Sequence, residues 1–313
     1  MEADILAAYE RIKSVVRETP VERSPALGGA FLKLEHLQHT GSFKFRGASH
    51  KLARLTPEQA VAGVIAASNG NHGLGVAAAA QARGVSAEVY VSSQVSPAKA
   101  RRIEALGALI RQAGEDPLAA EVAARRAAES SGKVFISPYN DLDVVAGQGT
   151  IAVELCRQLP RIDAVFVAVG GGGLIAGIGS YLKAVTPATE IVGCWPANSP
   201  VMHACMKAGA IVDVPELPTL SESTAGGLEP GSITLELCRS VVDRAVFVSE
   251  AEIQSAMERV LSQEHWLIEG AAAVAVAAFL KDAGRYAGKN VVVVICGRNV
   301  SPEVLRSIGL PLR

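Results

Sequence analysis

Short apolar runs alternate with segments of helical spacing along most of this chain. Unbroken apolar runs predict strands buried on both faces of a sheet, and the segments between them predict crossover helices. This alternation is typical of an α/β fold whose parallel sheets carry helices on both faces. The expected strands are 63–68, 87–93, 133–137, 164–169, 190–194 and 291–296, and the expected helices are 74–83, 97–107, 147–159 and 174–183.

Three of the expected strands lead into polar or glycine-rich loops, at 68–72, 170–173 and 296–299. The carboxyl ends of parallel strands gather at one edge of a sheet, and ligands of such folds bind in the crevice there. We therefore expect these loops, which are far apart in the sequence, to lie at ligand-binding positions.

Length and charge narrow the class of protein. The chain has 313 residues, a net charge of −1 and 49% hydrophobic residues. This length suits one large or two modest domains. The interspersed charges form no basic stripe of the kind that binds nucleic acid or an anionic membrane. The longest apolar run, 271–280, is too short to span a bilayer and predicts a buried helix.

The N-terminus and the cysteines indicate a compartment. The first residues lack the basic-then-apolar layout of a signal peptide. The five cysteines are scattered and form no CxxC pair, which is typical of reduced thiols in a cytosol. We expect a soluble cytoplasmic protein. No regulatory domain is expected after the 296–299 loop, because the chain ends at Arg313.

A lysine lies between two phenylalanines in the segment 40–47, Thr-Gly-Ser-Phe-Lys-Phe-Arg-Gly. Partial desolvation of Lys44 disfavours its ammonium form and makes the amine a better nucleophile, which suits formation of a Schiff base. The motif alone leaves open a solvated lysine at the start of a helix.

Four consecutive glycines, 170–173, close the expected strand 164–169 and open the expected helix 174–183. Glycines let backbone N–H groups approach an anion closely, and the N-terminus of a helix favours negative charge. The segment therefore predicts a phosphate site. It matches neither a Walker loop nor the dinucleotide pattern GxGxxG. A tight turn without a ligand remains the alternative.

Three further positions allow two interpretations each. The loop 68–72, Ser-Asn-Gly-Asn-His, can hold a carboxylate or a ring hydroxyl, or can simply cap a helix. Cys296 ends a strand and is by default an inert core cysteine. Glu269 is a single acid among apolar residues, so it is either a capping carboxylate or a functional group. His72 and His265 have no partner at metal-ligand spacing.

Taken together and in this order, the motifs resemble the serine/threonine dehydratase branch of fold-type II pyridoxal-5′-phosphate (PLP) enzymes, which includes threonine ammonia-lyases and serine racemase. The segments 33–48, 68–72, 137–150 and 169–177 carry the resemblance, which runs over nearly the whole chain. It implies two open parallel-sheet α/β domains of the tryptophan synthase β type, with the cofactor cleft between them. Residues 1–62 and 141–313 would form a large PLP-binding domain, residues 63–140 a small mobile domain, and the enzyme a homodimer.

The resemblance also assigns roles to individual residues. Lys44 would carry PLP as a Schiff base and later act as the base at Cα. Phe43 would pack beside the ring, Asn71 would hydrogen-bond its hydroxyl, and Cys296 would face its nitrogen. The phosphate would bind Gly170, Gly171, Gly172, Gly173 and Leu174. Substrate contacts would come from Ser68, Asn69, Gly70, His72 and Tyr139.

The implied reaction is β-elimination: a β-hydroxy amino acid such as threonine or serine loses water and ammonia and yields a 2-oxo acid. A neutral thiol at Cys296 favours elimination, because it leaves the ring a weaker electron sink. The alternatives are an amino-acid racemase, a dehydratase of hydroxyaspartate or β-aryl serine, and a catalytically idle PLP-binding protein. Asn69 disfavours the racemase, because an amide cannot replace the serine that serves the opposite face there.

Four positions depart from the family pattern. Trp195 and Val201 fall where metal-dependent members carry carboxylates, so no metal is expected. Gly226 replaces a usual aspartate and Arg298 a usual small residue, so we expect an altered pocket, with the Arg298 side chain directed to solvent. These changes leave the choice among β-hydroxy amino acids open.

Overall fold

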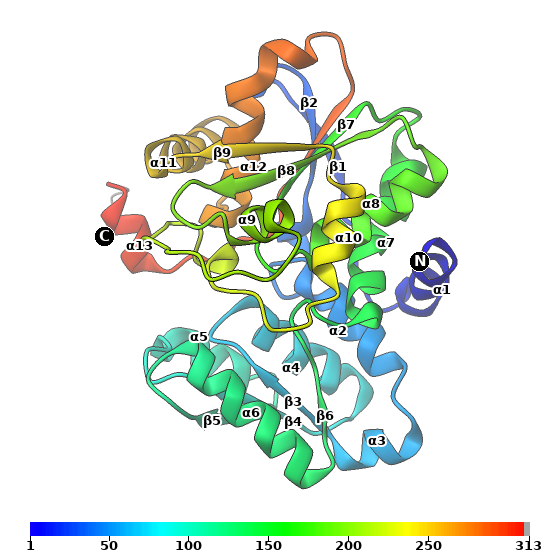
Figure 1. The fold of residues 1–313 in the computed structure, drawn as a ribbon, viewed down its shortest axis with the longest axis vertical. Helices are drawn as coiled ribbons and strands as arrows, with labels where there is room; N and C mark the ends of the chain where they lie inside the picture. Colours follow the sequence, from blue (N-terminus) through cyan, green and yellow to red (C-terminus); the bar gives the residue numbers. More distant parts are fainter. Residues whose placement is uncertain (310–313) are drawn as a thin grey trace.

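A computed structural model of the chain describes residues 1–309. It has two lobes, each built on its own sheet (Figure 1). The larger sheet has six strands in the order β1-β2-β10-β7-β8-β9, and every neighbouring pair is parallel except β1 and β2. Its strands are β1 (Val21–Ser24), β2 (Ala30–Lys33), β7 (Ala164–Ala168), β8 (Glu190–Pro196), β9 (Arg244–Val248) and β10 (Val291–Val294).

The smaller lobe has a four-stranded parallel sheet in the order β5-β4-β3-β6. Its elements are β3 (Val64–Ala67), α4 (Asn71–Arg83), β4 (Ala87–Val91), α5 (Pro97–Glu104), β5 (Leu109–Gln112), α6 (Pro117–Ser131) and β6 (Val134–Phe135). Strand and helix alternate here because each parallel connection needs a crossover.

The helices of the larger lobe cover its sheet on both sides (Figure 1). They are α1 (Glu2–Ile12), α7 (Leu142–Gln158), α8 (Gly173–Val185), α9 (Val201–Ala208), α10 (Thr234–Val241), α11 (Glu250–Arg259), α12 (Gly270–Asp282) and α13 (Pro302–Ser307). Helix α12 packs on β7 and β8 and is buried from Gly270 to Phe279, which confirms the buried helix expected at 271–280.

Helix α2 (Lys44–Ala53) lies between the lobes, packed against α4 on one side and α7 on the other, and α3 (Pro57–Ala62) follows it. Its contact with α7 is very close, because a Cβ added to Gly147 would lie 2.6 Å from the Cα of Gly47. The apolar side chains of α2, Phe45 and Leu52 among them, belong to the core of the smaller lobe. One helix thus joins the two lobes.

Polar contacts also connect the lobes, and three of them come from α5 and α6. Arg125 of α6 pairs with Glu229 in the loop before α10. Lys99 of α5 lies 3.3 Å from Glu222 (Nζ to Oε2), and Arg102 Nη1 donates to Asn299 Oδ1 at 3.0 Å. Together with α2 they hold the lobes in contact around the space between them.

The α/β fold with parallel sheets is confirmed, and all six expected strands are present, with ends that differ by up to two residues. The sequence pattern did not predict β1, β2, β5 or β9. Strand β5 is largely exposed and three of the four residues of β1 are polar, so neither forms an apolar run. The antiparallel β1–β2 pair is a hairpin at the edge of the larger sheet, which a βα alternation does not reveal.

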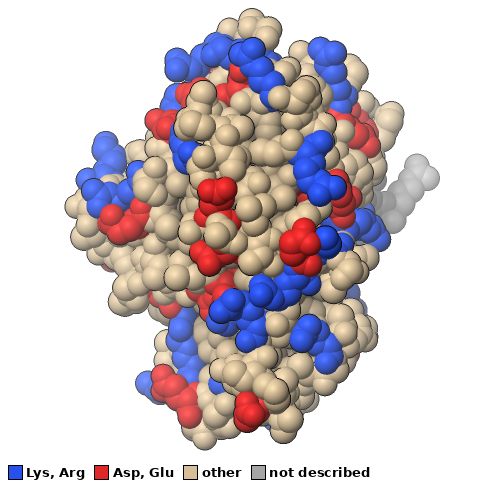
Figure 2. Space-filling model, turned by 90° about the vertical axis from the view of Figure 1, so that its right-hand side faces the viewer, with Lys and Arg blue, Asp and Glu red and all other residues tan. Residues whose placement is uncertain are grey.

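Acidic and basic side chains are interspersed over the face drawn in Figure 2, and basic side chains gather there where the two lobes meet. This distribution agrees with the net charge of −1. Within residues 1–309, no helix is long and apolar enough to cross a membrane.

Candidate active site

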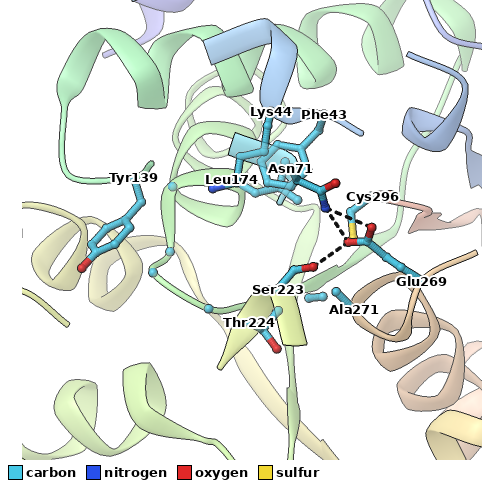
Figure 3. Close-up of a pocket in the computed structure, with 15 residues that line it drawn as sticks. Phe43, Lys44, Asn71, Tyr139, Leu174, Ser223, Thr224, Glu269, Ala271 and Cys296 are labelled. Atoms are coloured by element: carbon cyan, nitrogen blue, oxygen red, sulfur yellow. Dashed lines mark hydrogen bonds between the residues drawn. The ribbon is translucent and has the colours of Figure 1, made fainter. Parts of the chain in front are cut away.

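A cavity lies between the lobes, at the carboxyl ends of β7 and β10 and the first turns of α2, α4 and α8 (Figure 3). Loops from distant parts of the chain meet here, as the sequence predicted. The cavity is lined by all of the expected cofactor-binding residues: Phe43, Lys44, Asn71, Gly170–Gly173, Leu174 and Cys296.

Lys44 is the first residue of α2, and its amine donates a hydrogen bond to the carbonyl of Pro138 at 2.8 Å. Burial lowers the pKa of Lys44 to about 8, although the nearby Cys296 and Glu269 act in the opposite direction. The Phe43 ring centre lies 5.2 Å from Nζ, whereas Phe45 packs into the core of the smaller lobe. Only one of the two flanking phenylalanines therefore contributes to the desolvation of the amine.

The lowered pKa of Lys44 predicts how fast cofactor-free protein captures PLP at each pH. Only the neutral amine attacks an aldehyde, so the capture rate should rise about tenfold per pH unit and level off near pH 8, the pKa of Lys44. Stopped-flow absorbance follows the capture. Nα-acetyl-lysine, whose side-chain amine is free, serves as the control. Its rate of reaction with the same aldehyde should keep rising to about pH 10.4. A capture rate of the protein that keeps rising over the same pH range as the control would contradict the lowered pKa of Lys44.

The glycine segment is held tightly between two other chain segments. A Cβ at Gly170 would lie 2.8 Å from the Thr224 Cα, and one at Gly171 would lie 2.4 Å from the Tyr139 ring. Gly172 has a φ of +84°, which favours glycine, and it caps α8. The first N–H groups of α8 have no partner within the helix, so the loop offers an anion a cradle that side chains would fill.

Replacing Gly171 with alanine should therefore weaken PLP binding at least about tenfold and destabilise the fold by about 1–3 kcal/mol, because the new methyl group overlaps the Tyr139 ring. Equilibrium dialysis and urea unfolding measure the two effects. Gly284→Ala is the matched control, because nothing lies within 4 Å of its Cβ position and its φ is not positive. Equal behaviour of the two variants would exclude the tight cradle.

Asn71 begins α4 and is held from two sides. Its Nδ2 donates to both oxygens of Glu269, at 2.9 and 3.0 Å, and its Oδ1 accepts from Asn299 Nδ2 at 2.6 Å. Glu269 is the N-cap residue of α12 but makes no side-chain capping bond. Of the two interpretations that the sequence allowed for Glu269, the capping carboxylate is wrong.

Cys296 directly follows the β10 region and is buried. Burial raises the pKa of its thiol well above the ordinary value, with the Glu269 charge acting in the same direction. The side chain is thus a neutral thiol near neutral pH, as the sequence argument requires. The Cys296 carbonyl also accepts from the Phe43 N–H at 3.1 Å, which ties the lysine segment to the end of the sheet.

Asn71 lines the cavity, but the other residues of the loop 68–72 do not: Ser68, Asn69, Gly70 and His72. The Asn69 amide is engaged by Ser92, donating to its Oγ at 2.7 Å and accepting from its N–H at 2.9 Å. His72 Nε2 donates to the Ile136 carbonyl at 2.8 Å, and burial together with the Lys44 charge lowers the His72 pKa to about 3. The loop therefore offers backbone N–H groups at the start of α4, and its contact with substrate stays a prediction.

Tyr139 lines the cavity through its ring, while its hydroxyl accepts from the Glu229 N–H at 2.9 Å and points away from the other labelled residues (Figure 3). Lining residues that were not predicted are Ala168, Ser223, Thr224 and Ala271. Ser223 and Thr224 belong to a short irregular segment, for which neither helical nor strand spacing gives a signal.

The departures from the family pattern lie away from the cavity. Arg298 and Gly226 are exposed, and the φ of Gly226 is +112°. Trp195 and Val201 are buried in the core of the larger lobe. Residues 1–309 contain no cluster of three or more His, Cys, Asp or Glu side chains that could hold a metal ion.

Comparison with known proteins identifies the family. The model of the family described as "Pyridoxal-phosphate dependent enzyme" matches residues 12–297. The chain belongs to this family. It is 40% identical over 310 residues to L-threonine ammonia-lyase of Thermotoga maritima, an alignment that covers 97% of this chain and 77% of that protein.

Solved structures of the family agree with the fold described above. The processed form of threonine deaminase isoform 2 from Solanum lycopersicum superposes with a TM-score of 0.93 at 32% identity, over 98% of this chain and 91% of the other. Maize serine racemase superposes with a TM-score of 0.91 at 30% identity, over 98% and 95%. The cofactor of this PLP-dependent enzyme fits the cavity, which provides a buried amine, a glycine cradle and an amide donor.

Proposed function

We propose that this PLP-dependent enzyme is an ammonia-lyase that eliminates water from a β-hydroxy amino acid such as threonine or serine, giving a 2-oxo acid and ammonia. The observation that carries the proposal is the Lys44 amine, with a pKa lowered to about 8, in the same cavity as the glycine cradle 170–173. The relatedness to a threonine ammonia-lyase and a threonine deaminase supports the same reaction.

When bound, PLP withdraws electrons from the substrate Cα and so acidifies its proton. Lys44 would hold the cofactor between turnovers and, once displaced by the substrate amine, take up the Cα proton at Nζ. Its pKa near 8 suits a base that works near neutral pH. Cys296 and Tyr139 do not compete as bases, because burial raises both of their pKa values and keeps them protonated.

The other binding roles are part of the proposal. The N–H groups of 170–174 would bind the phosphate, Phe43 would pack beside the ring, Asn71 would donate to the ring oxygen, and Cys296 would face the ring nitrogen. The backbone of 68–72 would receive the substrate carboxylate.

Elimination is favoured over racemisation by the surroundings of Asn69. A racemase needs an acid or base on the face of the substrate opposite the lysine. An amide supplies neither, and this amide is already engaged by both the Oγ and the N–H of Ser92.

We further propose that residues 63–140 move as a small domain against 1–62 and 141–313, that the enzyme is a homodimer, and that it works in the cytoplasm. The four-stranded sheet and its helices lie within 63–140, which supports this division into two domains. The dimer is proposed on the resemblance to the family alone.

Three measurements test the function. Borohydride reduction of the PLP-loaded protein followed by peptide mapping should give a pyridoxyl adduct at Lys44, and the absence of one would reject an enzyme of this type. A 2-oxo acid assay over serine, threonine, hydroxyaspartate and β-aryl serine, each in both configurations, identifies the substrate. Chiral chromatography of the same samples should show less inverted amino acid than 2-oxo acid, and the opposite ratio would assign a racemase.

A further inference from the structure

The carboxylate of Glu269 is almost fully buried, with 4% of the residue exposed, yet within residues 1–309 it forms no ion pair shorter than 4 Å. It is held by neutral donors alone. Besides the two contacts from Asn71, it accepts from Ser223 Oγ at 2.9 Å and from the Asn299 N–H at 3.0 Å (Figure 3). Burying a carboxylate without an opposite charge is costly, and such groups are more frequent at functional sites than elsewhere.

The backbone around Glu269 is shaped to receive this carboxylate. A Cβ at Gly297 would lie 2.6 Å from Glu269 Oε2, so only glycine lets the end of the β10 segment pass so close. Because α12 begins directly after Glu269 and is buried, the carboxylate cannot turn outward to water. It is therefore a fixed feature of the cavity wall.

Counting donors shows what Glu269 does to Asn71. The Asn71 amide has two N–H donors and one carbonyl oxygen. Asn299 occupies the oxygen at 2.6 Å, and Glu269 takes one N–H through contacts of 2.9 and 3.0 Å from the same nitrogen. The amide is thereby fixed with its nitrogen, not its oxygen, on the cavity side, and one N–H is left for a ligand. If the amide turned over, its oxygen would face the carboxylate and be repelled.

Glu269 also supplies the negative charge of the cavity. Among the described residues that line the cavity, Glu269 is the one carboxylic acid, and Lys44 is the one Lys or Arg. The Glu269 charge raises the proton affinity of the Lys44 nitrogen, opposing the effect of burial. A carboxylate at this place therefore stabilises the protonated form of the nitrogen that joins Lys44 to a cofactor.

We propose that Glu269 is a positioning residue: it acts through Asn71, whose N–H it directs at the ring oxygen of the cofactor, and its charge keeps the nitrogen at Lys44 protonated. The inference rests on the proposed function, since it assumes PLP attached at Lys44. It gives a role to an acid that makes no capping bond and takes no part in the proton transfer assigned to Lys44.

Glu269→Gln tests the charge with little change of shape. The amide can keep its oxygen toward the Asn299 N–H and one contact with Asn71, because the Ser223 hydroxyl can turn and accept from the new NH₂ group. The readout is the visible absorption of the bound cofactor, titrated with pH in the absence of substrate. We expect the titration midpoint to fall by about one pH unit, a tenfold loss of proton affinity.

Asn299→Ala is the matched control, because it removes the other side-chain partner of Asn71 without removing a charge. It should weaken cofactor retention and leave the midpoint within about 0.3 units, which is less than half of one tenfold step. Asn71→Ala combined with Glu269→Gln tests the route. If Glu269 directs Asn71, its effect on cofactor affinity is smaller in the Asn71→Ala background than in the parent.

An unchanged midpoint in Glu269→Gln, or affinity losses that simply add in the double variant, overturns the proposal. Failure of the proposed function looks different, because the parent protein would then show no visible band and no adduct at Lys44. A thermal unfolding curve of each variant, recorded without cofactor, separates a folding defect from a loss of positioning. Glu269→Asp keeps the carboxylate, and it should therefore keep the titration midpoint of the parent protein.

Discussion

Lys44→Ala should lower 2-oxo acid formation by about 10⁴-fold, the upper end of what one positioned proton-transfer group contributes. The upper end is expected because the same amine both attaches the cofactor and serves as the base. Among the described residues that line the cavity, none is placed to replace it: the Cys296 thiol stays protonated and the Tyr139 hydroxyl faces away. The Glu269 carboxylate is held by Asn71, Ser223 and the Asn299 N–H. Steady-state assays with the substrate found in the panel measure the loss.

Lys51→Ala is the control for this variant. Lys51 lies on the same helix but is paired with Asp141 at 2.7 Å and Asp143 at 3.1 Å, outside the cavity. Its loss should change the rate less than about tenfold, because pairs of this partly exposed kind contribute about 1 kcal/mol or less. Equal activity of Lys44→Ala and the parent would end the assignment of Lys44.

Arg46→Met should destabilise the fold by about 3–5 kcal/mol, because it leaves buried carboxylates without their partner. The Arg46 guanidinium is fully buried and bridges Glu35 and Glu154, with four N···O distances between 2.6 and 2.8 Å. Burial alone would raise the pKa of Glu35, but the charge and hydrogen bonds of Arg46, together with the Lys33 charge and the Thr19 hydrogen bond, outweigh it, and the net shift is downward. Lys33 completes the cluster with a 2.6 Å contact to Glu154.

Urea unfolding measures the effect, with Arg54→Met as the matched control. Arg54 follows the same helix, is 52% exposed and pairs with Asp143 at 2.8 Å. An exposed pair contributes about 0–1 kcal/mol, so this variant should unfold close to the parent. If Arg46→Met lost no more stability than Arg54→Met, the buried cluster would not be a main support of α2.

The sequence allowed much of the site to be predicted, because its parts are local. Lys44 and the glycines 170–173 each lie at a junction of elements, where chain neighbours alone indicate desolvation or an anion cradle. The parallel strands then dictate that these junctions meet at one edge, so Asn71 and Cys296 also reached the cavity as expected.

What the sequence could not decide depends on side-chain partners that are distant in sequence. Whether Asn69 faces a substrate depends on Ser92, 23 residues away, and whether Glu269 caps a helix or faces a cavity depends on Asn71, 198 residues away. No spacing rule reports such pairs. Phe45 was also misjudged, because successive side chains at the start of a helix point to different sides, and Phe45 faces the smaller lobe.

The position of α2 between the lobes has a mechanical consequence. The Gly47–Gly147 contact and the bonds of Arg46 to Glu35 and Glu154 fasten this helix to the larger lobe. If the smaller lobe moves as proposed, α4 would shift relative to α2 while these contacts hold α2 on the larger lobe. The Lys44 nitrogen would then keep its place beside the glycine cradle, and the motion would admit substrate without disturbing that alignment.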